Sequence, residues 1–411
     1  MATLPRAHLE ASNRLDLLES AASAVHKHAE ERTLHKLESP ERVRLRLKRL
    51  LKHPLVERIL ETSGVAQELD STPSDRLSTM AAGELERVID GSEFMPVWFL
   101  TRGAELRRTV ARIRADAANG AEMYGSGFMV GPRLLLTNRH VLDWTDIGGQ
   151  GLEEISRHSF AEFDYEKEPN GITPSATTFR LDPATLLLTS PWHELDYVLI
   201  AVEPKDLVSH THSIEAYGYN RLAADQGKIN RGEPVFIIQH PYGQPKVVIV
   251  QSNRLIERRD DSPYLAYEAD TERGSSGAPV YNQQWEVVGL HHATQIARKN
   301  GEIVAKDDST WTPEMGADKI KYLKLNEGIR ISYILNQLAA KRDRARQGVS
   351  PLLPPEQCSA AGLRLLDEML QFMSGVDPVV LSAPVLTKTA EYHAPPQPSS
   401  PHEPHRFPRP D

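Results

Sequence analysis

The sequence predicts a multidomain protein with an all-α N-terminal domain, an all-β domain, and a C-terminal helix followed by a disordered tail. Three observations lead to this prediction. Before residue 91, apolar residues recur three and four positions apart, as they do along one face of a helix. Between residues 124 and 292, short β-rich runs alternate with turn residues, which is typical of a sandwich or barrel. The last twenty residues are rich in Pro, His and Ser, which favours disorder.

The composition narrows the class of protein. A chain of 411 residues, 40% of them hydrophobic and 25% charged, is long enough for two or three domains. Its single cysteine, Cys358, cannot pair within the chain, which argues against a disulfide-stapled secreted module. The net charge of −8 does not indicate nucleic-acid binding. Because the charged first thirty residues lack a secretory h-region, and no apolar run approaches the roughly 20 residues of a membrane span, we expect a cytoplasmic location.

Residues 1–91 are predicted to form the helical domain. Ser39 is placed to cap a helix that has Pro40 at its first position. Further helices are expected around 55–60 and over 74–89, each ending near a glycine.

The stretch 42–52, RVRLRLKRLLK, is basic. We interpret it as a solvated helix face, because acidic residues flank it, and not as a patch for nucleic acid. Attachment to an acidic membrane through 42–60 is the other alternative.

Residues 92–120 are apolar enough to predict a packed connector rather than a flexible one. The β-domain is predicted over 121–346, with a closing helix over 331–346. Residues 347–411 are expected to hold one amphipathic helix, over 359–375, and then the tail. The strands are predicted at 124–130, 133–137, 196–202, 234–239, 246–251, 264–269 and 286–292.

Three segments of the β-domain carry residues suited to nucleophilic catalysis. His140 follows a β-run in TNRHVL, Asp196 enters an apolar strand in LDYVLIAV, and Ser276 lies between glycines in GSSGAPVY. A serine hydroxyl needs a base to take its proton, and histidine titrates near neutral pH. A buried carboxylate fixes the imidazole tautomer and stabilises the imidazolium. The order His, Asp, Ser therefore predicts a catalytic triad.

The same motif predicts the groups that stabilise a developing oxyanion. Gly274 lets the chain bend so that its own N–H and that of Ser276 point at one spot. We infer no cofactor and no metal site, since the His210–His212 pair has no nearby cysteine and is interpreted as a surface loop.

These segments resemble the chymotrypsin-fold serine peptidases, and within them the glutamyl endopeptidases. The resemblance is carried by YGSGFMVGPRLLLTNRHVL, LDYVLIAV and DTERGSSGAPVYN, and it covers about residues 121–340. It implies two six-stranded β-barrels with His140, Asp196 and Ser276 between them. Ser275 departs from the Asp that pairs with a freed N-terminus in digestive trypsins, so activation through a new N-terminus is not expected.

A second resemblance concerns the N-terminal region. FMPVWFLTRGAELRRTVARI, over 94–113, resembles the junction in bacterial effector-associated trypsin-like peptidases. It implies that the helical domain is an adaptor that recruits a protein partner or a second copy, in a defence system.

The specificity pocket is expected from residues near the serine. By the resemblance, Thr271 and His291 hold a substrate Glu carboxylate by hydrogen bonds. Asp270 stands where trypsins bind Lys or Arg, so a preference for Lys or Arg remains an alternative. We expect one of the adjacent histidines, His291 and His292, to be a core residue and the other to face solvent.

The leading hypothesis is a regulated cytosolic serine endopeptidase acting on protein substrates. The alternative is a scaffold that binds peptides without turnover. The segment 295–325 is interpreted as a lid, an autoprocessing site or an insertion.

Overall fold

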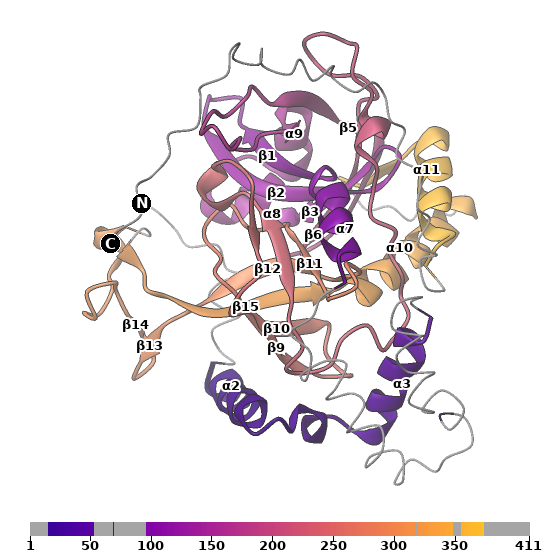
Figure 1. Cartoon of the computed structure of the whole chain (residues 1–411). Coiled ribbons are helices and arrows are strands. Elements are labelled where there is room, and N and C mark those ends of the chain that lie inside the picture. The colour runs from indigo at the N-terminus through magenta and orange to yellow at the C-terminus, as the bar shows by residue number, and fades with distance from the viewer. Residues whose placement is uncertain (1–14, 53–68, 70–95, 317–318, 348–354, 374–411) are drawn as a thin grey trace, which may run out of the picture. The chain divides into compact units, whose positions relative to one another are not determined.

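The computed structural model describes residues 15–52, 69, 96–316, 319–347 and 355–373. The helices expected around 55–60 and over 74–89, and the C-terminal tail, lie outside these residues. Within them, the predicted fold class is confirmed: helices at the N-terminal end, a β-domain, and C-terminal helices (Figure 1).

The first half of the β-domain is a closed barrel. Its seven-stranded sheet has the order β16-β5-β4-β1-β2-β3-β6, and β5 also pairs with β6, so the strands from β5 to β6 close on themselves. The strands are β1 (Val110–Asp116), β2 (Glu122–Gly131), β3 (Leu134–Asn138), β4 (Phe160–Phe163), β5 (Thr177–Ser190) and β6 (Tyr197–Val202), with β16 (Gln357–Cys358) added at the edge. The short helices α8 (Arg139–Leu142) and α9 (Leu152–His158) follow β3.

The second half is a barrel of similar construction, with the order β8-β7-β11-β12-β15-β10-β9. The strands β8 and β9 follow one another in the chain, and a bridge joins Pro234, just before β7, to Arg254 of β9. The strands are β7 (Phe236–Gln239), β8 (Val247–Ile249), β9 (Arg254–Arg258), β10 (Tyr264–Glu268), β11 (Pro279–Tyr281), β12 (Val287–Ile296) and β15 (Tyr322–Arg330). The segment 295–325 carries a short hairpin, β13 (Arg298–Lys299) and β14 (Glu302–Ile303).

The barrels meet over a shared apolar cluster. Leu199 from the first barrel and Leu290 from the second are both buried in it, as are Leu335 of α10 (Ile331–Arg346) and Leu366 of α11 (Ala360–Leu370). The predicted helix over 331–346 is therefore confirmed, and that over 359–375 is shorter. Since β16 pairs with β5, the described residues after 347 are integrated with the first barrel.

The segment 92–120, predicted as a connector, supplies secondary structure of its own. Its first part forms helix α7 (Trp98–Arg107) and its second part forms β1, which pairs with both β2 and β4. The prediction of a connector is therefore wrong for its second part, where the apolar residues of VARIRAD alternate with arginines as one face of a strand does.

The N-terminal helices pack on the second barrel. They are α2 (Leu15–Glu30), the 3₁₀ turn η2 (Leu34–Leu37) and α3 (Pro40–Leu50). Ser39 caps α3 as expected, with its Oγ accepting a hydrogen bond from the N–H of Arg42 at 3.4 Å. Leu18 and Val25 of α2 share an apolar cluster with Ala266 of β10 and Leu325 of β15. Figure 1 shows α2 beneath β9 and β10.

The interpretation of 42–52 as a solvated face is wrong for two of its arginines. Arg46 is 0% exposed, and its guanidinium donates to both carboxylate oxygens of Glu233 and to Oε1 of Gln284. Arg49 makes a similar two-atom contact with Glu286. The positive charges of these two arginines are therefore paired with carboxylates inside the molecule, as buried arginines require.

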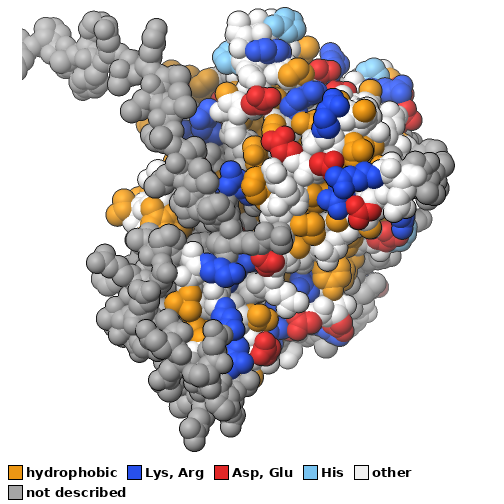
Figure 2. Space-filling model, turned by 90° about the vertical axis from the view of Figure 1, so that its right-hand side faces the viewer, with side chains coloured by type: hydrophobic (Ala, Val, Ile, Leu, Met, Phe, Trp, Pro, Cys, Tyr) orange, Lys and Arg blue, Asp and Glu red, His pale blue; other side chains and the backbone are white. Residues whose placement is uncertain are grey.

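The surface shown in Figure 2 mixes both signs of charge, with Lys and Arg interspersed among Asp and Glu over the described residues. No helix in the described part of the chain is both long and apolar enough to cross a membrane.

Candidate active site

The structure brings His140 and Asp196 together. His140 is the second residue of α8, at the end of β3, and Asp196 directly precedes β6, which pairs with β3. The Nδ1 of His140 lies 2.6 Å from Oδ2 of Asp196, and the backbone N–H of His140 donates to Oδ1 at 3.1 Å. Both carboxylate oxygens therefore hold the same histidine, which fixes the position of its ring.

Asp196 is buried, and its backbone is held in an unusual conformation. Its φ is +37°, in the left-handed region that aspartate tolerates better than most residues. Its carbonyl accepts hydrogen bonds from Nδ2 of Asn138 and the N–H of Arg139. Burial alone raises the pKa of the Asp196 carboxyl, but the charges and hydrogen bonds of His140 and His292 outweigh burial and hold it well below its usual range. Asp196 is thus an anion throughout the neutral range.

A second histidine contacts the same carboxylate oxygen. Nδ1 of His292 lies 2.9 Å from Oδ2 of Asp196, and its Nε2 lies 3.9 Å from the buried carboxylate of Glu327. The expectation that either His291 or His292 faces solvent is wrong, because both are buried. The β12–β15 register shifts between His291 and Ala293, and this bulge allows two successive side chains to point inward.

The loop that carries Ser276 is held against the first barrel through Ser126 of β2. The N–H of Ser126 donates to the carbonyl of Ser276 at 2.8 Å, and its hydroxyl donates to the carbonyl of Gly274 at 2.8 Å. Position 277 also requires glycine, since a Cβ there would lie 2.1 Å from the carbonyl oxygen of Ser126. The same Cβ would lie 3.2 Å from the backbone N of Asn138, two residues before His140. Ser276 therefore lies at the end of β3 that carries His140.

The glycine before the serine is required by close backbone approach. Gly274 has a φ of +94°, and a Cβ there would lie 2.6 Å from the carbonyl of His240. The N–H groups of Gly274 and Ser276 have no hydrogen-bond partner in the described part of the chain, so both remain free to donate to an oxyanion. Ser275 is buried, and its hydroxyl accepts from the N–H of Glu272 at 3.1 Å. A neutral hydroxyl here stabilises the loop.

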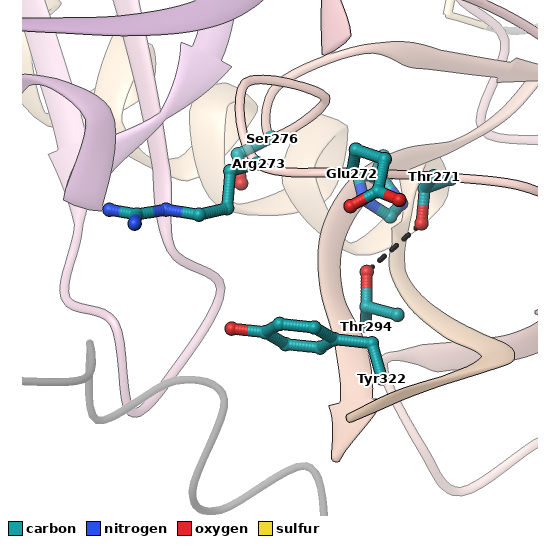
Figure 3. A pocket seen from close by; sticks show the side chains of 7 residues that line it. Thr271, Glu272, Arg273, Ser276, Thr294 and Tyr322 are labelled. Carbon is teal, nitrogen blue, oxygen red and sulfur yellow. Dashed lines mark hydrogen bonds between the residues drawn. The ribbon is translucent and has the colours of Figure 1, made fainter. Parts of the chain in front are cut away.

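A pocket that is partly open to solvent lies beside Ser276. Its lining includes two of the three residues predicted to bind substrate, Thr271 and His291. The other lining residues are Glu272, Arg273, Ser276, Thr294 and Tyr322. Figure 3 shows Thr271 and Thr294 facing each other across one wall, with the Arg273 side chain extending away from them.

The third predicted residue, Asp270, lies outside this pocket. Its exposed carboxylate pairs with Nζ of Lys324 at 2.8 Å, on the surface beside β15. The pocket instead has an acid at its rim, Glu272, whose carboxylate accepts the phenolic hydrogen of Tyr242 at 2.6 Å. That hydrogen bond and burial raise the pKa of Tyr242 to about 12.

Hydrogen bonds order the pocket floor. Thr271 donates from its hydroxyl to Oδ1 of Asn326, and its Oγ1 lies 2.9 Å from that of Thr294. Nδ1 of His291 lies 2.6 Å from the phenolic oxygen of the buried Tyr267.

The side chains of His140, Asp196 and His292 gather closely enough to share a metal ion, since their ligand atoms lie within 4.8 Å of one another. The contacts of 2.6 and 2.9 Å are hydrogen-bond lengths. Tetrahedral zinc with bonds near 2.0–2.1 Å separates its ligand atoms by roughly 3.3 Å. The group fits a proton-sharing network better than a metal site.

Sequence reasoning did not identify several residues of the site. Thr294 and Tyr322 carry no motif of their own, and their place in the pocket depends on the β12–β15 pairing. The HH pair did signal His292, but its contact with Asp196 depends on the bulge.

Comparisons with known proteins agree with this geometry. Residues 125–290 match the family described as "Trypsin-like peptidase domain". An uncharacterized protein, y4fB, of Sinorhizobium fredii is 32% identical over 319 residues, which cover 74% of this chain and 46% of that protein. A glutamyl endopeptidase of Staphylococcus epidermidis is 27% identical over 199 residues, covering 46% of this chain and 61% of that protein. The chain thus spans only about half to three fifths of the length of these relatives.

Among solved structures, the active form of the Rv3671c protease from M. tuberculosis shows a TM-score of 0.37 and 17% sequence identity, and the match covers 66% of this chain and 93% of that one. Over residues 125–290 the chain is thus similar to the trypsin-like peptidase domain family.

Proposed function

We propose that this protein is a serine endopeptidase that uses Ser276 as nucleophile, His140 as base and Asp196 as the carboxylate that orients the base. The observation that carries the proposal is the 2.6 Å contact between His140 and Asp196 in a chain that matches a trypsin-like domain and has Ser276 among the residues lining a pocket. With Nδ1 of His140 bound to Asp196, the proton-accepting atom of the neutral ring is Nε2.

The reaction proceeds through an acyl-enzyme. The Ser276 hydroxyl attacks the scissile carbonyl while His140 takes its proton, and the imidazolium then protonates the leaving amine. The N–H groups of Gly274 and Ser276 donate to the oxyanion that forms. A water molecule then attacks the acyl-enzyme while His140 takes its proton. The imidazolium returns the proton to the Ser276 oxygen, which frees the Ser276 hydroxyl.

We further propose that the pocket prefers a Glu side chain before the cleaved bond. His291 and Thr294 line the pocket, and an imidazole and a hydroxyl are groups that can donate hydrogen bonds to a carboxylate. Arg273 at the rim adds a positive charge. The similarity to a glutamyl endopeptidase supports the same preference.

A preference for Lys or Arg has one observation in its favour, the Glu272 carboxylate at the rim. That carboxylate is exposed and engaged by Tyr242, so it is screened by water. Asp270 pairs with Lys324 outside the pocket. A basic substrate side chain would therefore meet no buried acid, and the Glu preference is the better supported.

The N-terminal helices are proposed to regulate or recruit the peptidase in the cytoplasm, as the resemblance to effector-associated peptidases in defence systems implies. The described helices α2 and α3 are bound to the second barrel through apolar and ionic contacts. A partner protein would therefore act on a peptidase to which these helices are already docked.

The test uses the full chain, a fluorophosphonate probe and a peptide library that varies the residue before the cleaved bond. We expect labelling at Ser276 and cleavage after Glu, and we expect both to be lost in Ser276→Ala. The matched control is Ser262→Ala, a serine in the β9–β10 turn. Cleavage that persists in Ser276→Ala would reject the assignment, and a folded chain that neither labels nor cleaves would favour the scaffold.

A further inference from the structure

The first barrel contacts the turn formed by residues 240–244, which joins β7 to β8 in the second barrel. Arg112 of β1 lies directly opposite Ser126 of β2, so both side chains project from the same face of the sheet. The Arg112 guanidinium donates from Nη1 to the carbonyl oxygen of Gly243 at 2.6 Å. The Ser126 hydroxyl accepts a hydrogen bond from the N–H of His240 at 3.0 Å. The first barrel therefore holds this turn near both of its ends.

The Arg112 side chain is itself fixed by its neighbours. Its Nε lies 2.7 Å from Oε2 of Glu162, the residue opposite it on β4. Its guanidinium carbon lies 3.8 Å from the ring centre of Tyr165 and 5.0 Å from that of Tyr124. An ion pair and two aromatic rings order a planar guanidinium well. The donor for the Gly243 carbonyl therefore has a defined position.

The backbone of the turn adopts a conformation that needs support from outside. Tyr242 has a φ of +54°, in the left-handed region that a bulky side chain rarely adopts. Gly243 follows with a φ of +64°, and a Cβ there would lie 2.6 Å from Cγ of Tyr124. Because Arg112 binds the carbonyl of the second of these two residues, it helps to hold both of them in this conformation.

The turn in its place sets the direction of the peptide group between Arg273 and Gly274. The N–H of Tyr242 donates to the carbonyl of Arg273. A trans peptide group is planar, with its C=O and N–H pointing to opposite sides, so the Gly274 N–H points away from Tyr242. That N–H is one of the two proposed oxyanion donors. A flip of this peptide group would break the Tyr242 contact and turn the donor away from the oxyanion.

We propose that Arg112 is a positioning residue for the oxyanion hole. By holding Gly243, it keeps the N–H of Tyr242 against the carbonyl of Arg273. That contact in turn keeps the Gly274 N–H directed at the oxyanion. The inference rests on the proposed serine endopeptidase activity and adds to it a residue of the first barrel. Without the contact, the flipped peptide group is populated, and only the remaining fraction of molecules stabilises the transition state fully.

The test is Arg112→Met, which keeps most of the length of the side chain and removes its donors. We expect kcat for a peptide that the wild type cleaves to fall about tenfold. KM should change little, because the peptide flip removes an oxyanion donor and leaves the specificity pocket in place. Arg112→Lys keeps a cationic donor but not the planar fork, so it should recover part of the loss.

Arg114→Met is the matched control. Arg114 lies two residues along β1 on the same face and also binds Glu162, at 3.0 Å, but none of its described contacts reaches the turn. We expect this variant to keep the wild-type kcat and KM. Should loss of its ion pair with Glu162 unfold Arg112→Met, the double variant Arg112→Met, Glu162→Gln removes both partners and should show the same fall in kcat. A folded variant without Arg112 that matches Arg114→Met in kcat overturns the inference.

A peptide aldehyde reports on the oxyanion hole directly. The Ser276 oxygen adds to the aldehyde carbon, the Ser276 proton passes to His140, and the aldehyde oxygen becomes the oxyanion. The Ki of the aldehyde should rise in Arg112→Met by the factor by which kcat/KM falls. The corresponding peptide alcohol forms no oxyanion and should bind both proteins equally. Equal losses of affinity for the aldehyde and the alcohol would mean that Arg112 supports the pocket, and would overturn the inference.

Crystal structures of the wild type and of Arg112→Met test the inference without turnover. We expect the Arg273 carbonyl to face the N–H of Tyr242 in the wild type and to be flipped in most molecules of the variant, as a tenfold fall in kcat requires. An Arg273 carbonyl that stays against Tyr242 in the variant refutes the positioning role even where the wild type is active. A wild type with the expected orientation that neither cleaves peptides nor binds the aldehyde refutes the proposed function instead.

Discussion

The imidazole of His292 lies 2.9 Å from Oδ2 of Asp196, the same oxygen that His140 contacts at 2.6 Å. One buried carboxylate therefore holds two histidine rings. The second ring links Asp196 to Glu327, another buried acid, at 3.9 Å.

The role of His292 is tested by replacement. In His292→Ala, Asp196 loses one hydrogen bond and is held less firmly, so we expect kcat to fall about tenfold with little change in KM. In His292→Asn, the amide retains a donor near Nδ1 and should recover part of the loss. Steady-state kinetics on a Glu peptide measures both. His158→Ala, on the exposed end of α9, is the control, and equal kcat values for His292→Ala and the wild type would contradict this role.

Glu272 is expected to weaken the preference for Glu. Its carboxylate lies at the pocket rim, so it repels a substrate carboxylate, and exposure to water keeps the effect small. Glu272→Gln should raise the ratio of kcat/KM for Glu over Lys peptides about three- to tenfold. Glu257→Gln, on β9 away from the pocket, should leave that ratio unchanged. A fall in the ratio for Glu272→Gln would favour the basic preference.

The contact between Arg46 and Glu233 is expected to be essential for docking α3. Removing one partner of a buried pair leaves an uncompensated charge, so Arg46→Ala should lower the free energy of unfolding by about 3–5 kcal/mol. The double variant Arg46→Met, Glu233→Leu should recover much of this loss. Urea unfolding measures both.

Lys48→Ala is the control for this pair, since Lys48 lies on the same helix and its side chain is exposed. An unchanged midpoint for Arg46→Ala would mean that the helix is held by its apolar contacts alone.

Lys228 makes stability depend on pH. Burial, and then the charge of Arg49, lower the pKa of Lys228 to about 7, while its ammonium donates to the carbonyls of Ala223 and Val287. Above pH 7 the unfolded chain binds more protons at this group than the folded chain does, so stability should rise from about pH 7 toward the unfolded pKa near 10.4. The Lys228→Met variant should lack this rise. Thermal unfolding of both proteins across pH 7–10 tests this prediction. Stability that changes with pH in the same way in the wild type and in Lys228→Met would refute it.

The candidate triad was predictable because each of its residues lies in a local motif. Gly274 and Gly277 have no room for a side chain, because a Cβ at either position would lie within 2.6 Å of a backbone oxygen. Such positions require glycine, so the pair of glycines around Ser276 is visible in the sequence. His140 and Asp196 each stand at the end of an apolar strand. Strand ends in a barrel meet at one rim, so the strands themselves indicate where these side chains gather.

The sequence by itself determined which candidate reactive groups to expect and in what order, seven of the strands, and the helix over 331–346, whereas β1, β4, β5, β9, β11 and β15 were not among the predicted strands. Tertiary structure alone decided which side chains each of these groups meets. His292 reaches Asp196 through a bulge, Tyr267 and Asn326 reach the pocket through strand register, and Arg46 is buried by a surface far away in the chain. Hydrogen-bond and ion-pair partners depend on distances of a few ångströms between segments distant in sequence, and no local pattern of residues encodes those distances.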